Sequence, residues 1–297
     1  TNFCKIGPFI LPKMAVPKPT PYLLWRDNLS VREAFKIYRS TNQLDDLRNE
    51  KSSNTLAILG SGGSINEISE KEWDFISSID SLALNWWGVY HDFVPSFYQW
   101  EAPGDDLTEF WIEEMNKKRD LYANQNVTLI FDPERMYGMK ENVAEILDKI
   151  DPSLFSSLVD IRLAIYYSQK NSGFGPEVKF AFPTLPFTNR LLHSRGSLSQ
   201  AIAIGAHMGY DDIILFGVDL NNSEYFFSTD PKSHKSTDQG KDPEENHATA
   251  KRDQFKPIDE YVCFLNETIL EETEMSIGTK NSLLFPRLDY YEEKFEI

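Results

Sequence analysis

Short apolar runs alternate with amphipathic stretches through the middle of this 297-residue chain, and this alternation constrains the fold more than any other feature. The expected strands are residues 56–59, 81–84, 96–100, 127–131, 178–182 and 213–216. The expected helices between them are residues 67–76, 107–118, 140–150 and 198–208. Because strands that alternate with helices pair in parallel, the sequence predicts an α/β fold with a Rossmann-like, doubly wound and mostly parallel sheet.

The segments on either side of this pattern suggest four parts of the chain. Residues 1–50 are expected to be an extended N-terminal arm with a helix at 31–38, since five prolines fall within residues 1–25, and residues 41–53 are polar and linker-like. Residues 51–220 are the expected nucleotide-binding domain, and residues 221–256 a polar lid or acceptor loop. Residues 257–297 are expected to form a helix and tail that complete the domain.

Composition excludes several classes of function. A net charge of −16 argues against a nucleic-acid partner, which needs basic stripes to displace counterions. An anionic ligand would need a local exception, which Arg190, His193 and Arg195 offer. No apolar run is long enough to span a membrane, and two cysteines cannot form a disulfide framework. We therefore expect a cytoplasmic location, with peripheral association at the cytoplasmic face of the inner membrane still allowed.

A glycine loop formed by Gly60, Ser61, Gly62, Gly63 and Ser64 follows the first expected strand. The order strand, glycine turn, helix would expose backbone N–H groups that favour a phosphate or another anion. No Gly-Lys-Ser/Thr follows, so the loop is not a P-loop, and Ile65 stands where a G-x-G-x-x-G motif has its third glycine. Phosphate binding and a plain strand-to-helix turn both remain open on this pattern.

Polar residues stand at or just after the ends of several expected strands, where doubly wound sheets bind ligands. Asp219 could bind a hydroxyl or metal, act as a nucleophile or cap a turn, and Glu101 could be a second carboxylate or a surface acid. His247 lies in the polar 221–256 segment, from which a mobile lid could deliver a general base. A solvated loop histidine is the alternative. No zinc-binding or hydrolase motif is present.

Several of these motifs resemble, in the same order along the chain, those of the bacterial sialyltransferases of glycosyltransferase family 42, which use CMP-sialic acid. Gly60-Ser-Gly-Gly-Ser-Ile65 is similar to the family's Gly-Asn-Gly-Pro-Ser-Leu loop, and Phe97-Tyr98-Gln99 to its Phe-Tyr-Asn. Asp212-Ile-Ile-Leu-Phe-Gly-Val-Asp219 is similar to its Glu-Ile-Tyr-Leu-Ser-Gly-Ile-Asp strand. The other similar stretches are Asn85, Gly196-Ser197, residues 201–210, His247 and Asn281-Ser-Leu-Leu284. Together they span residues 55–285.

The resemblance implies a GT-A-like fold of the sialyltransferase type with a smaller lid region, and a CMP-activated sugar as donor. It implies that the glycine loop and Asn85 bind the nucleotide and that His247 is the general base. The residues that it places on the donor sugar are Gln99, Arg195, Ser197 and Tyr225. No metal or other cofactor is implied. The acceptor would be an oligosaccharide or glycolipid, and a homo-oligomer is allowed.

The departures from the family pattern lie on the sugar side. Gln99 replaces an Asn, while Asn221 and Glu244 each stand where the family has a Tyr. The donor could therefore carry sialic acid, another nonulosonic acid or Kdo. Kdo transferases of related fold are retaining and use an Asp nucleophile with a nearby Glu and His. Asp219, Glu101 and His247 could fill these roles.

Two other functions stay open on the sequence. One is a pyrophosphokinase of the hydroxymethylpterin type, which resembles the same glycine-rich layout and would need ATP and Mg²⁺ held by Glu101 and Asp219. The other is a non-catalytic nucleotide-binding module.

Overall fold

The structure is a computed structural model that describes residues 41–42, 44–101, 105–132, 143–160, 162–166, 190–193, 196–233, 246–251, 257–268 and 270–292. Its strands are β1 (Thr41–Asn42), β2 (Thr55–Leu59), β3 (Asp80–Leu84), β4 (Phe97–Glu101), β5 (Thr128–Asp132), β6 (Ser157–Asp160), β7 (Arg162–Tyr166), β8 (Arg190–His193), β9 (Asp212–Phe216), β10 (Glu274–Ile277) and β11 (Asp289–Tyr290).

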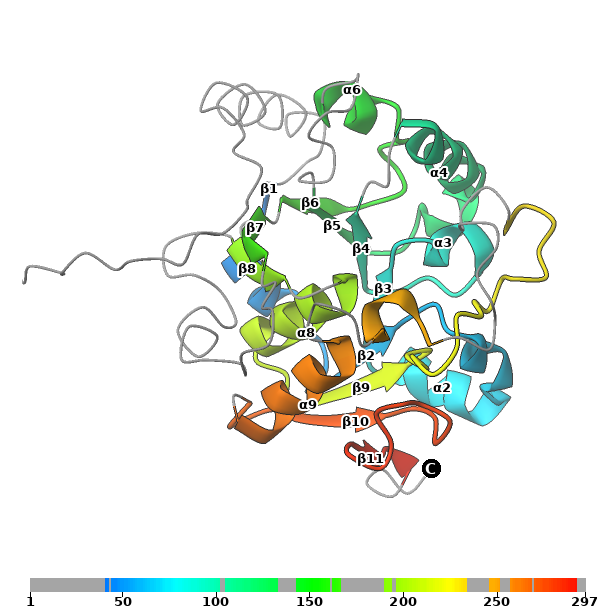
Figure 1. The fold of residues 1–297 in the computed structure, drawn as a ribbon. Coiled ribbons are helices and arrows are strands. Elements are labelled where there is room, and N and C mark those ends of the chain that lie inside the picture. Colours follow the sequence, from blue (N-terminus) through cyan, green and yellow to red (C-terminus); the bar gives the residue numbers. More distant parts are fainter. Residues whose placement is uncertain are drawn as a thin grey trace, which may run out of the picture.

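The helices of the described ranges connect these strands (Figure 1). The α-helices are α2 (Glu70–Ser78), α3 (Trp87–Tyr90), α4 (Asp105–Lys117), α5 (Arg119–Tyr122), α6 (Val143–Asp148), α8 (Ser197–Met208) and α9 (Ile258–Thr268). The described ranges also contain the 3₁₀ helices η1 (Leu44–Asn49), η2 (Gly63–Glu67) and η5 (Ala248–Ala250).

Nine of the strands form one sheet in the order β1-β6-β5-β4-β3-β2-β9-β10-β11, and every neighbouring pair is parallel. Strands β7 and β8 pair separately, also in parallel. From β2 the chain first builds the sheet outward through β3 to β6, and later adds β9 to β11 on the other side. The strand order therefore reverses between β2 and β9. Doubly wound sheets bind ligands outside the carboxyl ends of the strands at such a switch point.

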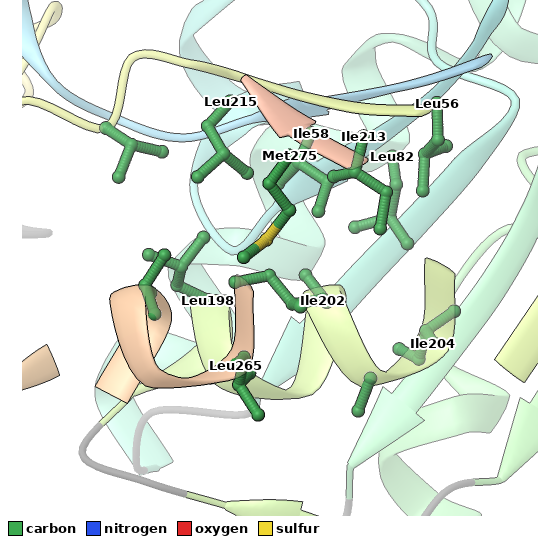
Figure 2. Packing of buried hydrophobic residues seen from close by; sticks show 14 of the residues in the cluster. Leu56, Ile58, Leu82, Leu198, Ile202, Ile204, Ile213, Leu215, Leu265 and Met275 are labelled. Carbon is green, nitrogen blue, oxygen red and sulfur yellow. The ribbon is translucent and has the colours of Figure 1, made fainter. Parts of the chain in front are cut away.

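Each face of the sheet is covered by helices, as the alternation of side chains along a strand requires. Leu56 and Ile58 of β2 point to one face, where they pack with side chains of α8 and α9, including Ile202 and Leu265 (Figure 2). Ala57 and Leu59 belong to the core on the other face, with residues of α2 to α6. All five residues of β2 are buried. The predicted doubly wound α/β fold is confirmed.

Aromatic rings fill much of the second face. Trp100 of β4 stacks on Trp111 of α4 with ring centroids 3.9 Å apart. Tyr98 meets the same tryptophan edge-on at 5.9 Å. These aromatic pairs pack against the sheet near the carboxyl ends of β3 and β4, and so they make that part of the sheet edge rigid.

The structure corrects two expectations about local structure. Residues 44–49 were expected to be part of a polar linker, but they form η1, whose Leu44 and Leu47 are buried against α8. The glycine loop was expected to open directly into an α-helix. It continues instead into the short helix η2, and α2 begins only at Glu70, where Ser69 and Glu72 form a capping box.

Several predicted elements lie outside the residues that the structure describes. Among them are the strand at 178–182 and the helix at 31–38. Within the described part of the chain, no helix combines the length and the apolar character needed to cross a membrane.

Candidate functional site

The glycine loop packs its backbone against the loop that follows β9. The Gly60 N–H donates to Phe216 O at 2.8 Å, and the Gly62 N–H donates to Gly217 O at 2.7 Å. A Cβ on Gly60 would overlap the Gly217 carbonyl, and a Cβ on Gly62 would lie 2.5 Å from the Asp219 carboxylate. Gly217 itself has a φ of 63°. The glycines therefore allow two strand-end loops to touch at the switch point.

Asp219 lies at this contact, 5% exposed. Its carboxylate accepts a hydrogen bond from the Ser64 backbone N–H at 3.0 Å and a second one from the Ser64 hydroxyl. The carboxylate thus takes the place of an external anion at the start of η2. This contact corrects the picture of the glycine loop as an open helix N-terminus, because a side chain of the protein already caps it.

Residues 281–284 hold the Asp219 loop from the other side. The Ser282 hydroxyl donates to Val218 O at 2.6 Å, and the Leu283 N–H donates to Asp219 O at 2.8 Å. The Asn221 side-chain amide donates to Asn281 O. The Asn-Ser-Leu-Leu stretch noted in the sequence is therefore the support of the loop after β9.

Asn85 joins the ends of β3 and β4 to the start of α8. Its side-chain amide donates to Ser197 Oγ at 2.7 Å, and its side-chain oxygen accepts from the Glu101 N–H at 3.2 Å. Its carbonyl accepts from the Tyr98 hydroxyl and, at 3.1 Å, from Trp111 Nε1. Burial raises the pKa of Tyr98, so this hydroxyl stays a donor. Asn85 also has a φ of 49°, an unusual conformation for a residue other than glycine.

Gln99 and Glu101 are buried next to this junction, at 0% and 4% exposure. Gln99 Nε2 donates to Gln200 Oε1 of α8 at 2.7 Å. The Gln99 side-chain oxygen is buried without a hydrogen-bond partner in the structure. A buried amide oxygen in this position is costly unless a ligand or water donates to it.

A segment that we call the strap (residues 222–233) crosses the glycine loop. Tyr225 forms an isolated antiparallel bridge with Gly62, and the Phe226 N–H donates to Ser61 O at 3.0 Å. Asn66 Nδ2 donates to Phe226 O at 2.9 Å. The strap therefore adds a strand-like layer to the glycine loop.

The far end of the strap is fixed on α3 and α4. Phe227 stacks on Tyr90 with centroids 4.2 Å apart, and Lys232 pairs with Glu114 at 2.6 Å. Burial alone would raise the pKa of Glu114, but hydrogen bonds from Lys117 and Lys232 hold it below its usual value. The described part of the predicted lid is thus a docked segment.

His247 is held at the amino end of η5, beside the strap. Its backbone N–H donates to Leu220 O at 3.0 Å, and its ring atom Nε2 lies 3.3 Å from the Tyr225 hydroxyl. Its Nδ1 lies 2.9 Å from Thr249 Oγ1. A Cβ on Gly196 would come within 3.2 Å of the Thr249 methyl group, so η5 also sits against the start of α8.

These contacts join the predicted site residues of the described ranges into one arc along the carboxyl edge of the sheet. From Asp219 and the glycine loop the arc runs through Tyr225 and His247 to Thr249. It continues at Gly196 and ends in the cluster of Ser197, Asn85, Glu101 and Gln99. Arg195 lies outside the described residues.

Sequence reasoning missed Thr249 of the arc and Gln200, which bonds to Gln99 of the arc, whereas Gly217 was expected at the site as part of the strand end 217–219. Gly217 had a signal, since a glycine directly after a buried strand indicates a close approach of the backbone. Among the described residues, no three His, Cys, Asp or Glu side chains form a group suited to a metal, so we assign no metal ligands there.

Comparisons with known proteins add no relative: no protein-family model matches the chain, and neither the curated proteins nor the solved structures that were searched include a match.

Proposed function

We propose that the protein is a glycosyltransferase that moves a 2-keto acid sugar from a CMP donor to a surface-glycan acceptor. The sugar would be sialic acid, another nonulosonic acid or Kdo. The observation that carries this proposal is the arc itself. In the arc, Asn85, Ser197, Tyr225 and His247 lie with the glycine loop along the carboxyl edge of the sheet, where the strand order reverses. In the sequence these residues are far apart.

In this proposal the two ends of the arc hold different parts of the donor. The glycine loop and Asn85 hold the cytidine and its phosphate. Because the Gly60, Gly62 and Ser64 N–H groups already donate within the protein, the loop's contacts to the donor come from Ser61 and Gly63. Ser197 stands at the first turn of the 12-residue helix α8, where backbone N–H groups favour an anion such as the sugar carboxylate. Gln99, Arg195 and Tyr225 complete the sugar side. The donor needs no further cofactor.

His247 carries the proton transfer. The acceptor hydroxyl oxygen forms a bond to the anomeric carbon, the bond from that carbon to the phosphate oxygen breaks, and CMP leaves with the bonding pair. Nε2 of His247 takes the acceptor proton. A retaining route through Asp219 is less favoured, because the Asp219 carboxylate already accepts two hydrogen bonds from Ser64. Those bonds stabilise its charge and make it a poorer nucleophile.

The test is transfer from a panel of CMP-sugars to glycan acceptors, read by mass spectrometry. We expect one CMP-sugar to give product and His247→Ala to lower turnover by about 10²-fold or more. In a thermal-shift assay, CMP should raise the melting temperature of the wild type and of His247→Ala equally, because His247 does not bind the nucleotide. His207→Ala is the matched control, since His207 lies near the far end of α8, beside Asp45. It should transfer normally per folded molecule.

Two results would overturn the proposal, and a third would change the mechanism. Stabilisation by ATP with Mg²⁺ and not by CMP would favour the pyrophosphokinase. CMP binding without transfer to any acceptor would favour a binding module. A product that keeps the donor's anomeric configuration in NMR would return the nucleophile role to Asp219.

A further inference from the structure

Thr249 contacts one of the two ring nitrogens of His247 with two of its groups. Thr249 supplies two groups to Nδ1, its hydroxyl at 2.9 Å and its backbone N–H at 3.4 Å. Nε2 faces the Tyr225 hydroxyl. The ring is therefore oriented from the η5 side, with Nε2 toward the strap.

The two Thr249 groups do not constrain the protonation of the ring in the same way. A backbone N–H can only donate, so its bond requires an unprotonated Nδ1 and puts the proton of the neutral ring on Nε2. A hydroxyl can also accept, so Thr249 Oγ1 can take a hydrogen bond from a protonated Nδ1. A base that acts through Nε2 needs that second state, both before it takes a proton and as the imidazolium afterwards.

We propose that Thr249 is the positioning residue of the His247 base, and this inference rests on the proposed function. In the active state its hydroxyl accepts from Nδ1–H, in place of the 3.4 Å contact that the Thr249 N–H donates, and so keeps the proton of the neutral ring off Nε2, the atom that takes the acceptor proton. This is the role of the third group in a nucleophile–base–orienter arrangement. Thr249 touches the base and not the reacting atoms.

The packing of Thr249 fixes its side chain for this task. The methyl group faces Gly196, where an added Cβ would lie 3.2 Å away, while the hydroxyl faces the ring. Exchange of the two groups would break the hydrogen bond and place the hydroxyl against the glycine. The absence of a side chain at Gly196 thus lets the Thr249 turn sit close to the start of α8.

The first test reads the protonation of the ring and needs no substrate. In protein labelled with ¹⁵N-histidine, two-bond ¹H–¹⁵N NMR distinguishes Nδ1–H from Nε2–H, and His247→Gln assigns the signal. We expect the wild type to populate the Nδ1–H form. Thr249→Val, which keeps the shape and the backbone N–H, should shift His247 toward the Nε2–H form, and Thr249→Ser should restore it. Thr268→Val makes the same change on an exposed hydroxyl of α9 and should leave the signal unchanged.

The second test reads catalysis with the same variants. Thr249→Val should lower kcat about tenfold or more, the factor that a hydrogen bond to a charged ring is worth, while KM stays within about twofold. Thr249→Ser should recover most of kcat. Circular dichroism and thermal melting establish that each variant is folded.

The outcomes separate this inference from the proposed function. An unchanged His247 tautomer in Thr249→Val, or a Thr249→Ser variant as impaired as Thr249→Val, overturns the positioning role even if the wild type transfers sugar. Failure of the wild type to transfer from any CMP-sugar overturns the proposed function, and the catalytic role of Thr249 falls with it. The NMR result still decides whether Thr249 sets the tautomer.

Discussion

At the scale of single residues, the glycine loop has a structural role that its sequence motif does not predict: it packs against the end of β9 and the loop that follows. The Gly60 and Gly62 N–H groups donate to the carbonyls of the last residue of β9 and of the first residue after it, and their missing side chains make room for the loop that follows β9. A glycine-rich turn after a strand is usually interpreted as room for a ligand. Here the space beside Gly60 is filled by the protein's own backbone at Gly217.

Alanine substitutions within the loop should therefore differ sharply in effect. Gly60→Ala places a methyl group on the Gly217 carbonyl and should destabilise the protein by about 1–3 kcal/mol, the cost of overpacking. Gly63→Ala is the matched control. Its Cβ would meet no atom closer than 3.8 Å, so stability should stay within about 0.5 kcal/mol. Urea unfolding measures both, and equal effects would contradict the packing role.

Residues at strand ends were the easiest part of the site to predict. Asn85, Glu101 and Asp219 follow apolar runs whose parallel pairing brings their ends to one edge. Thr249 could not be found in this way, because its contact depends on the three-residue helix η5, which no apolar run in the sequence indicates. A threonine two residues after a histidine is common and carries no signal by itself.

At the scale of elements, the strap shows how a polar segment becomes ordered. Its sequence has few aliphatic residues, but Phe226 and Phe227 are buried, and Phe226 packs on His91 and Trp87. Burial and, to a smaller extent, the charge of Lys118 lower the pKa of His91 to about 4, so the ring is neutral beneath the strap at pH 7. Two aromatic anchors and an ion pair replace the apolar periodicity that sequence patterns detect.

Loss of the ion pair should loosen the end of the strap. Lys232→Met keeps the apolar stem and removes the charge that pairs with Glu114. The Lys232 side chain is 52% exposed, so we expect only about 0.2–1 kcal/mol, seen as up to about fivefold faster hydrogen exchange of strap amides. Lys149→Met removes an exposed pair with Glu109 and should leave strap exchange unchanged. Equal exchange in the two variants would show that the aromatic anchors suffice.

Apart from the five-residue strand β7, which pairs outside the main sheet, the strands that the sequence missed are short. Strands β6, β10 and β11 have four, four and two residues, too few for a period to emerge. They take their conformation from neighbours already in the sheet. The longer buried strands and α8 were predicted to within about one residue, because their apolar runs are continuous.

At the scale of the whole molecule, the core extends beyond the alternating pattern. Leu44 and Leu47 of η1 join the same cluster as α8 and α9, so residues before β2 belong to the folded unit. Next to them, His207 of α8 lies 2.9 Å from Asp45, and Arg48 donates to His207 O at 2.6 Å. The expected N-terminal arm thus contains part of the core.

A substitution in this segment should lower the stability of the whole domain. Leu47→Ala removes a side chain of 0% exposure and should cost about 2–5 kcal/mol in urea unfolding. Leu121→Ala makes the same change at a side chain of 40% exposure and should cost less than about 0.5 kcal/mol. A similar small effect for both would mean that η1 is only loosely attached.

The pairing of β2 with β9 also bears on how the chain folds during its synthesis. Strand β2 leaves the ribosome long before β9 exists, although the two become neighbours in the middle of the sheet. Until residue 216 has emerged, one side of β2 is an open edge of unpaired N–H and C=O groups flanked by apolar side chains. Such nonlocal pairing folds slowly and leaves the nascent chain exposed to aggregation. The six strands made first therefore keep an unpaired edge until the three made last have been synthesised.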